Sequence, residues 1–275
     1  MKKRILIALD LEGVNLVVGK PYEALDKGCE EWEKARHQAA LEVNAAADAL
    51  FAAGAEKVAL WDNHGGGGNI VPEEIDSRVE IIYRDRTRPR MYFAPDFDAV
   101  CYFGYHAMEG TLGGVLAHTM SSKTVQYYKL NGKHIGEIDM DTYIAASHGV
   151  PSVFFAGGDI ACAQAKRAAA DIVTVVTKKE ISRNEAHFRD NFELLSEIRE
   201  KIVEAVSRDT SYKKLEFPCT VEKSFKRTED AAAHILHLES FGIKGEHPCD
   251  EILGKDAHTV VATAENIVEF IRCCV

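Results

Sequence analysis

The sequence predicts an α/β fold: a mainly parallel sheet flanked by helices, with an inserted β-hairpin and a smaller α+β C-terminal subdomain. Two observations lead to this prediction. Short, almost continuously apolar runs recur over residues 5–179, as in strands that are buried on both faces. Alanine-rich stretches with high helix propensity lie between some of them, so that strands and helices alternate as in βαβ units.

The predicted buried strands are five apolar runs that end in polar or glycine residues. They are Ile5–Asp10, Lys57–Asn63, Ala99–His106, Pro151–Asp159 and Asp171–Lys179. A long helix is expected between the first two, over Tyr22–Ala53, and Gly54 is placed to end it. A second helix fits Asp159–Ala170.

Residues 123–139 break this alternation, because two alternating runs flank Asn131 and Gly132, the dipeptide typical of a tight hairpin turn. Beyond Ser182 the chain becomes more polar. We expect one amphipathic helix over Arg183–Asp209 and then strand, helix, strand and helix. The prediction is a catalytic domain over residues 1–185 and a smaller subdomain over 186–275, with the boundary within 183–209.

Charge and composition exclude several classes of partner. Among the 275 residues, 33 Lys and Arg stand against 43 Asp and Glu, a net charge of −10. Nucleic acids and anionic membranes attract clustered positive charge, so neither is an expected partner. The run Ile5–Leu9 is too short for a secretory signal, and none approaches the roughly 18 residues of a membrane span. Seven cysteines without a CxxC pair suit a reducing compartment, so we expect a cytoplasmic protein.

Potential metal ligands gather at the ends of the predicted strands. Asp10 and Glu12 end the first run, and alternate residues of an extended chain share a face, so both carboxylates should point the same way. His64 and His106 end the second and third runs. Ligands of parallel sheets bind at the carboxyl ends of the strands. Mixed carboxylate and imidazole donors suit zinc, manganese or iron.

Two more candidates are Glu137, on the return arm of the expected hairpin, and His118. Each candidate also has an ordinary structural interpretation. Asp10 could cap a helix, His106 could be a turn or packing residue, and Glu137 could be a solvated rim charge. The coincidence of several ligand types at strand ends favours a metal site.

Four glycines, Gly65–Gly68, follow His64. A Walker-type phosphate loop would need Lys and Ser or Thr after the last glycine, and a Rossmann fingerprint would open a helix, whereas Pro72 follows soon. The run is therefore interpreted as a turn, or as a place where a substrate backbone approaches His64. Asp62 either orients the imidazole of His64 or caps this turn.

Five motifs, in this order, resemble the D-aminopeptidase family of the DppA type, the M55 metallopeptidases. They are DLEGV, DNHG, GYHAM, GVLAHTM and NGKHIGEI, and the likeness covers about residues 4–185. The resemblance implies removal of N-terminal D-residues, notably D-alanine, from short peptides, and assembly into homodecamers of stacked rings. This chain departs from the family at Asn63, where a small residue or serine is usual, and at Gly65–Gly68.

The resemblance also implies two divalent ions per chain, with zinc first and manganese, cobalt or iron as alternatives. Asp10 is expected to bridge the ions. Glu12 and His106 would complete the protein ligands of one ion, and His64 and Glu137 those of the other.

His118 matches the family's catalytic histidine, described there as a nucleophile or base. The ordinary pKa of an imidazole suits a base for the attacking water or an acid for the leaving amine. Direct nucleophilic attack is not expected, because a metal-bound hydroxide would make a covalent step unnecessary. Asp62, Asn63 and Gly65 are expected beside the ligands or the substrate.

Two other functions stay open. A dinuclear phosphoesterase would use the same ligands with nearby cations, for which Lys178, Lys179 and Arg183 are available. The second open function is a non-catalytic binding protein on the same fold. Such a protein would be expected to lack one of the metal ligands.

Overall fold

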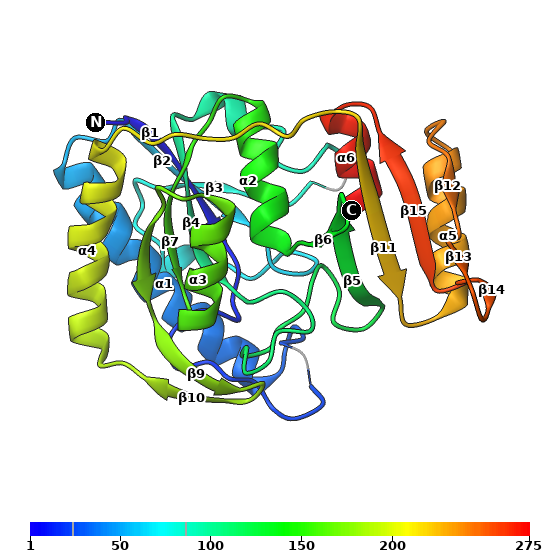
Figure 1. Cartoon of the computed structure of the whole chain (residues 1–275). Coiled ribbons are helices and arrows are strands. Elements are labelled where there is room, and N and C mark those ends of the chain that lie inside the picture. The colour runs from blue at the N-terminus through cyan, green and yellow to red at the C-terminus, as the bar shows by residue number, and fades with distance from the viewer. Residues whose placement is uncertain (24, 86) are drawn as a thin grey trace.

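A six-stranded parallel sheet forms the centre of the computed structural model, which describes residues 1–23, 25–85 and 87–275 (Figure 1). The strand order is β3-β2-β1-β4-β7-β8, and all neighbouring strands are parallel, as predicted. The strands are β1 (Arg4–Leu9), β2 (Lys57–Asp62), β3 (Glu80–Ile82), β4 (Ala99–Tyr105), β7 (Ser152–Gly157) and β8 (Val173–Val176).

Helices cover both faces of this sheet, which explains why its strands are almost continuously apolar. Ile5, Ile7 and Leu9 of β1 belong to the core under α1 and α4, whereas Leu6 and Ala8 belong to the core under α2 and α3. The helices are α1 (Glu30–Ala52), α2 (Glu137–Ser147), α3 (Asp159–Ala168) and α4 (Asn191–Ser207). No helix among the described residues is long and apolar enough to cross a membrane.

A second, antiparallel sheet with the order β12-β15-β11-β5-β6 lies beside the first (Figure 1). Its strands are β5 (Val125–Leu130), β6 (Lys133–His134), β11 (Cys219–Phe225), β12 (Gly245–Glu246) and β15 (Thr259–Ala264). Helices α5 (Thr228–Glu239) and α6 (Ile267–Cys274) pack on it. These elements confirm the strand, helix, strand and helix expected near the C-terminal end.

The predicted hairpin is present, with Asn131 and Gly132 in its turn at φ 49° and 79°, but its return arm is only the two residues of β6. Glu137 is therefore not on a strand and begins helix α2 instead. Gly136 ends the extended segment, because its N–H donates to the Asp139 carboxylate at 2.8 Å and starts the helix.

The two sheets draw on both halves of the sequence. The hairpin pairs with β11 of the second sheet, while α4 packs against α1 and the parallel sheet. The division of the chain near residue 185 stays a prediction.

Two helix boundaries were predicted wrongly. Helix α1 begins only at Glu30, because Gly28 has φ 92° and the Cys29 sulfur accepts a hydrogen bond from the Trp32 N–H. It ends as predicted, with Gly54 at φ 94° just beyond the helix. Residue 24, within the predicted range, lies outside the described residues.

The second error concerns Arg183–Asp209, whose first part is not helical. Strand β10 (Glu185–Phe188) pairs with β9 (Lys178–Ser182), and α4 starts after Asp190, whose carboxylate accepts from the Glu193 N–H at 3.1 Å. The remaining short elements are β13 (Cys249–Asp250), β14 (Gly254–Lys255) and the 3₁₀ turns η1 (Pro72–Glu74) and η2 (Ala94–Asp96).

Two glycines let the loop after β1 lie directly on β4. The Gly13 N–H donates to the Gly104 carbonyl at 2.6 Å, and a Cβ on Gly104 would lie only 1.9 Å from the Asp10 carbonyl oxygen. Gly104 also has φ 70°. Only glycine permits this contact, which holds Asp10 against the strand that leads to His106.

We expect Gly104→Ala to lower the free energy of unfolding by at least about 3 kcal/mol more than Gly110→Ala. Gly110 has a similar φ of 79° but no atom within 4 Å of an added Cβ, so the control shares the backbone strain without the clash. Urea unfolding of both metal-free variants measures the difference. Equal losses would contradict the proposed close contact.

Candidate metal centre

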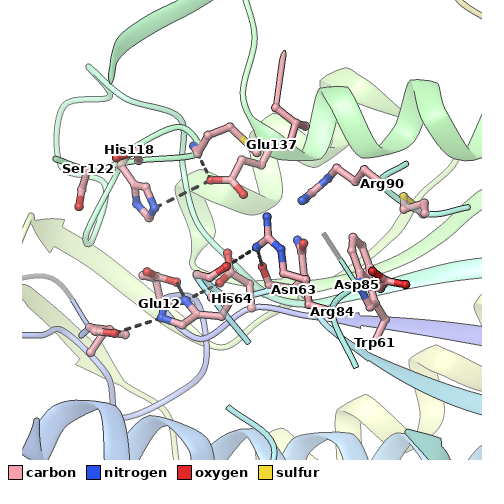
Figure 2. Close-up of a pocket in the computed structure, with 18 of the residues that line it drawn as sticks. Glu12, Trp61, Asn63, His64, Arg84, Asp85, Arg90, His118, Ser122 and Glu137 are labelled. Atoms are coloured by element: carbon pink, nitrogen blue, oxygen red, sulfur yellow. Dashed lines mark hydrogen bonds and ion pairs between the residues drawn. The ribbon is translucent and has the colours of Figure 1, made fainter. Parts of the chain in front are cut away.

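The predicted ligands meet where three neighbouring strands end. Asp10 follows β1, His106 follows β4, and His64 lies two residues beyond β2. These strands are adjacent in the order β2-β1-β4, and the order of the chain reverses at β1, so the site lies at the topological switch point of the sheet. Figure 2 shows the imidazole of His64 close to Glu12.

Asp10 is the shared carboxylate of this cluster. Its Oδ1 lies 2.9 Å from Nδ1 of His64, and its Oδ2 lies 3.4 Å from Nε2 of His106. Glu12 reaches the same Nδ1 of His64 at 3.2 Å. Both carboxylates converge as predicted, but the reason was wrong. Strand β1 ends at Leu9, and a turn rather than an extended strand aims them.

Glu137 and His118 complete the cluster from other segments. Oε1 of Glu137 lies 3.4 Å from Nε2 of His106 and 3.9 Å from Nε2 of His118. The same oxygen accepts from the Met120 N–H at 2.7 Å, which ties the start of α2 to the His118 loop. The rings of His106 and His118 are stacked, with centroids 3.9 Å apart. Figure 2 shows Glu137 and His118 facing one another across the site.

Each imidazole is oriented by a backbone carbonyl on its outer nitrogen. Nε2 of His64 lies 3.1 Å from the carbonyl oxygen of Leu25. Nδ1 of His106 lies 2.9 Å from the carbonyl oxygen of Ala107. Nδ1 of His118 lies 2.9 Å from the carbonyl oxygen of Leu116. A proton held on each outer nitrogen makes the inner nitrogen the one that can offer its lone pair to a metal once any proton on it has left. Metal-binding histidines are commonly fixed in this way.

The cluster fits divalent cations. Nε2 of His106 is buried and has no hydrogen-bond partner, although it faces two carboxylates, and such an atom is costly unless a ligand satisfies it. Asp10 and Glu12 are also buried, at 3% and 4% exposure. Buried carboxylates need compensating positive charge. Oxygen and imidazole donors together suit zinc and its neighbours in the first transition series.

The electrostatics of the histidines point to the same need for cations. Burial alone would lower the pKa of His64, but Glu12 and Asp10 outweigh it and raise that pKa well above its ordinary value. Burial likewise opposes the effect of Glu137, Glu12 and Asp10 on His106, yet they raise its pKa to about 10. Protons on these imidazoles therefore balance the carboxylates when no metal is bound.

The carboxylates share the cluster unequally. Burial and repulsion from Glu12 raise the pKa of Asp10 to about 7. Burial would also raise the pKa of Glu137, but its contact with the His106 imidazole, which is charged when protonated, lowers that pKa to about 2. His118 differs from the other histidines, because burial and the charge of His106 lower its pKa to about 4.

We expect zinc binding near neutral pH to release on the order of one or two protons per chain. The pKa values of His64 and His106 are raised, so both imidazoles are protonated in the metal-free protein and must lose that proton to bind a metal. Affinity should therefore rise with pH towards about 10 and fall on acidification. Calorimetry in two buffers of different ionisation enthalpy measures the release, and proton uptake would contradict it.

Three overlapping groups of described residues offer ligand atoms that all lie within 4.8 Å of one another. They are Asp10–Glu12–His64, Asp10–His106–Glu137 and Glu12–His106–His118. Asp10 occurs in two groups, as a bridging carboxylate would. The third joins Glu12 with His106, the pair expected on one ion, whereas no group of described residues joins His64 with Glu137. Which ligands share an ion stays a prediction.

The glycine loop after His64 is a capped turn. The Asp62 carboxylate accepts from the N–H groups of Gly68 and Asn69 at 2.7 and 2.8 Å, so it caps the turn and does not touch the His64 imidazole. Of the two roles considered for Asp62, the structure shows the cap. Asn63 and Gly65 line the pocket in front of the cluster, and their contact with ligands or substrate stays a prediction.

The three cations considered for a phosphoesterase do not line this pocket. Lys179 is exposed on β9, and Arg183 donates to the Ala117 carbonyl at 2.7 Å, which supports the loop before His118. Lys178 is fully buried. The phosphoesterase hypothesis loses the residues on which it depended.

Lys178 supports the metal centre in a way that the sequence did not predict. Its ammonium donates to the carbonyl oxygens of Glu12 at 2.5 Å, Val14 at 2.9 Å and Val17, so it holds the loop that carries Asp10 and Glu12. No sequence signal distinguishes it from Lys179, because only the face of β9 on which each lies decides the burial.

Lys178→Met is expected to weaken zinc binding by about 10- to 100-fold, as losses of groups that support metal ligands commonly do. Three buried carbonyl groups would lose their donor and the loop would loosen. Competition with a chromogenic chelator measures the affinity. Lys179→Met on the same strand is the matched control, and equal affinities of the two variants would exclude a role for Lys178.

The cluster opens into a pocket with a volume of about 550 Å³. One side includes His118 and four of the expected ligands, Asp10, Glu12, His64 and Glu137. The other side consists of Trp61 and the segment after β3, from which Arg84, Asp85 and residues 88–93 line the space. A volume in this range is typical of sites for small ligands.

Comparison with known proteins gives concordant results. Residues 3–272 match the peptidase family M55, described as D-aminopeptidase. A D-aminopeptidase of Bacillus subtilis (strain 168) is 27% identical over 184 residues, which cover 66% of this chain and 65% of that relative, just under two thirds of its length. The structure of the Zn-dependent D-aminopeptidase DppA from Bacillus subtilis, a self-compartmentalizing protease, shares the fold. Its TM-score is 0.84 at 22% identity, over 98% of this chain and 94% of that one.

Proposed function

The chain belongs to the D-aminopeptidase family of M55 peptidases, and from this we propose that it is a metal-dependent aminopeptidase that removes N-terminal D-amino acids from short peptides. The observation that carries the proposal is the buried cluster in which Asp10 contacts both His64 and His106. A relative with the same fold is Zn-dependent.

Two zinc ions per chain are the proposed occupants, with Asp10 between them and Glu12, His64, His106 and Glu137 as the other ligands. Bound there, such ions would polarise a scissile carbonyl and lower the pKa of water. Three carboxylates would neutralise part of their charge and leave Lewis acidity for the reaction.

His118 is proposed to move the proton in the reaction. The carbonyl of Leu116 holds a proton on Nδ1, so Nε2 presents its lone pair to the site. Since its pKa is lowered to about 4, the ring is neutral near pH 7 and can accept a proton from the attacking water at Nε2. The same atom would then donate that proton to the leaving amine. The stack on His106 keeps the ring in this orientation.

We further propose a cytoplasmic homodecamer of stacked rings whose enclosed pockets admit only short peptides. The description of the DppA relative as self-compartmentalizing supports a closed assembly. Multi-angle light scattering of the purified protein tests it, and a monomer would contradict it.

A substrate panel tests the activity. It contains D-alanyl and L-alanyl dipeptides and a generic phosphate ester, each with untreated protein, with chelator-treated protein and after zinc or manganese is restored. We expect cleavage of the D-alanyl peptide that the chelator abolishes and zinc restores. A protein that binds no metal and gains no activity from added zinc or manganese would contradict the proposal. Hydrolysis of the phosphate ester alone would favour the phosphoesterase.

A further inference from the structure

The wall of the pocket that faces the metal centre carries cations. We propose that Arg84 and Arg88 bind the C-terminal carboxylate of the substrate, so that this protein acts on di- and tripeptides with a free carboxyl end. The inference rests on the proposed function, because it takes the amine end of the peptide to lie at the metal centre.

Arg84 lies beside the metal ligands. Its Nη1 donates to the carbonyl oxygen of Asn63 at 3.3 Å and to that of Gly65, the two residues that flank His64. These bonds fix the guanidinium at the pocket wall, next to the ligand loop. Figure 2 shows the Arg84 side chain reaching into the pocket between His64 and Arg90. A planar guanidinium held in this way matches a carboxylate in shape and charge.

Arg88 lies further along the same wall. Its guanidinium stacks over the ring of Tyr92, 4.3 Å from the centroid, and both residues line the pocket. Stacking orders the plane of an exposed guanidinium while its edges still offer N–H donors. Among the described residues no carboxylate forms an ion pair with Arg88. Its charge helps to lower the pKa of Asp85 without an ion pair to that carboxylate, so the guanidinium can still bind an incoming anion.

Three other charged side chains of the pocket also have partners within the protein. Arg90 forms a buried bidentate pair with Asp141, at 2.5 and 2.8 Å. Lys123 pairs with Asp26 at 2.9 Å. Asp85, next to Arg84 in sequence, accepts hydrogen bonds from the backbone and hydroxyl of Thr87, so its carboxylate is occupied in its own turn.

The polarity and the size of the pocket agree with a short zwitterionic peptide. The carboxylate-rich end would hold the metals and, with them, the amine end of the substrate, whereas Arg84 and Arg88 attract an anion at the other side. A pocket of about 550 Å³ lies in the range typical of sites for small ligands, so its size suits a short peptide. Charge complementarity of this kind selects among substrates more than it raises affinity for all of them.

The test compares a D-alanyl dipeptide with the same dipeptide as its C-terminal carboxamide. The zinc-loaded wild-type protein should prefer the free acid by about tenfold or more in kcat/KM, through charge-assisted hydrogen bonds. Arg88→Gln and Arg84→Gln should each remove most of this preference by raising KM for the acid, with the carboxamide little changed. Arg208 is exposed just after α4 and does not line the pocket. The control variant Arg208→Gln should therefore keep the preference for the free acid.

Equal kcat/KM for acid and carboxamide in the wild type would overturn the carboxylate site and leave the proposed function intact. A variant of Arg84 or Arg88 that loses both substrates by the same factor, with normal zinc content and circular dichroism, would overturn it as well. A wild-type protein that cleaves neither substrate would overturn the proposed function and this inference together.

Discussion

Asp10→Asn is expected to lower kcat/KM by about a thousandfold or more and to reduce the bound zinc to one ion per chain or none. Asp10 is the carboxylate shared by two of the ligand groups, and it contacts both His64 and His106. Asparagine keeps the shape of the Asp10 side chain but loses the negative charge and the second anionic oxygen. A carboxylate that bridges two cations needs this charge and both of its oxygens.

The same substitution should not destabilise the metal-free protein. Burial and Glu12 raise the pKa of Asp10 to about 7, so ionisation of this carboxyl is disfavoured in the folded state. The resulting cost in stability grows as the pH rises from about 4, the ordinary pKa of an aspartate, and is complete above 7. Metal analysis by plasma mass spectrometry, kinetics and thermal unfolding are measured on one preparation. Asp98→Asn, which removes a surface carboxylate paired with Arg4, is the control. Full zinc content with retained activity in Asp10→Asn would exclude the bridging role.

His118→Ala is expected to keep the zinc content of the wild type while kcat falls by about 10²- to 10⁴-fold, the range for a lost acid–base group. His118 is neutral near pH 7, its outer nitrogen is fixed by Leu116, and its inner nitrogen faces the cluster. Removal of a proton carrier slows the chemical step, whereas metal affinity depends on the five other residues.

His187→Ala replaces an exposed histidine of β10 and serves as the control for kcat and for metal content. Two results would remove the assigned role of His118. Unchanged turnover in His118→Ala would show that no proton passes through it. Loss of an ion would show that it acts as a ligand in the group with Glu12 and His106.

The ends of the parallel strands could be predicted from the sequence, because a strand that is buried on both faces of the sheet is a continuous apolar run in the sequence. Asp10, His64 and His106 follow such runs, and the parallel order of β2, β1 and β4 brings them together. Glu137 was expected to be a ligand because of its motif, but it was placed on the wrong element. The signal for the hairpin turn is local, whereas the start of α2 depends on Gly136 and the Asp139 cap.

The supporting residues could not be predicted, because tertiary contacts define them. Lys178 differs from Lys179 only in the face of a short strand that each occupies. Arg84 acquires its position from hydrogen bonds to the loop of His64, which is distant in sequence, and Arg84 itself belongs to none of the five motifs. The contact between Gly104 and the Asp10 carbonyl is likewise visible only once β1 and β4 are adjacent.

The most direct test of the metal centre is a crystal structure of the zinc-loaded protein with anomalous scattering recorded on both sides of the zinc edge. Two strong peaks should lie on either side of the Asp10 carboxylate, within bonding distance of Glu12, His64, His106 and Glu137, and neither should be bonded to His118. Peaks that do not touch Asp10, or no peak in this pocket, would contradict the assignment of the site.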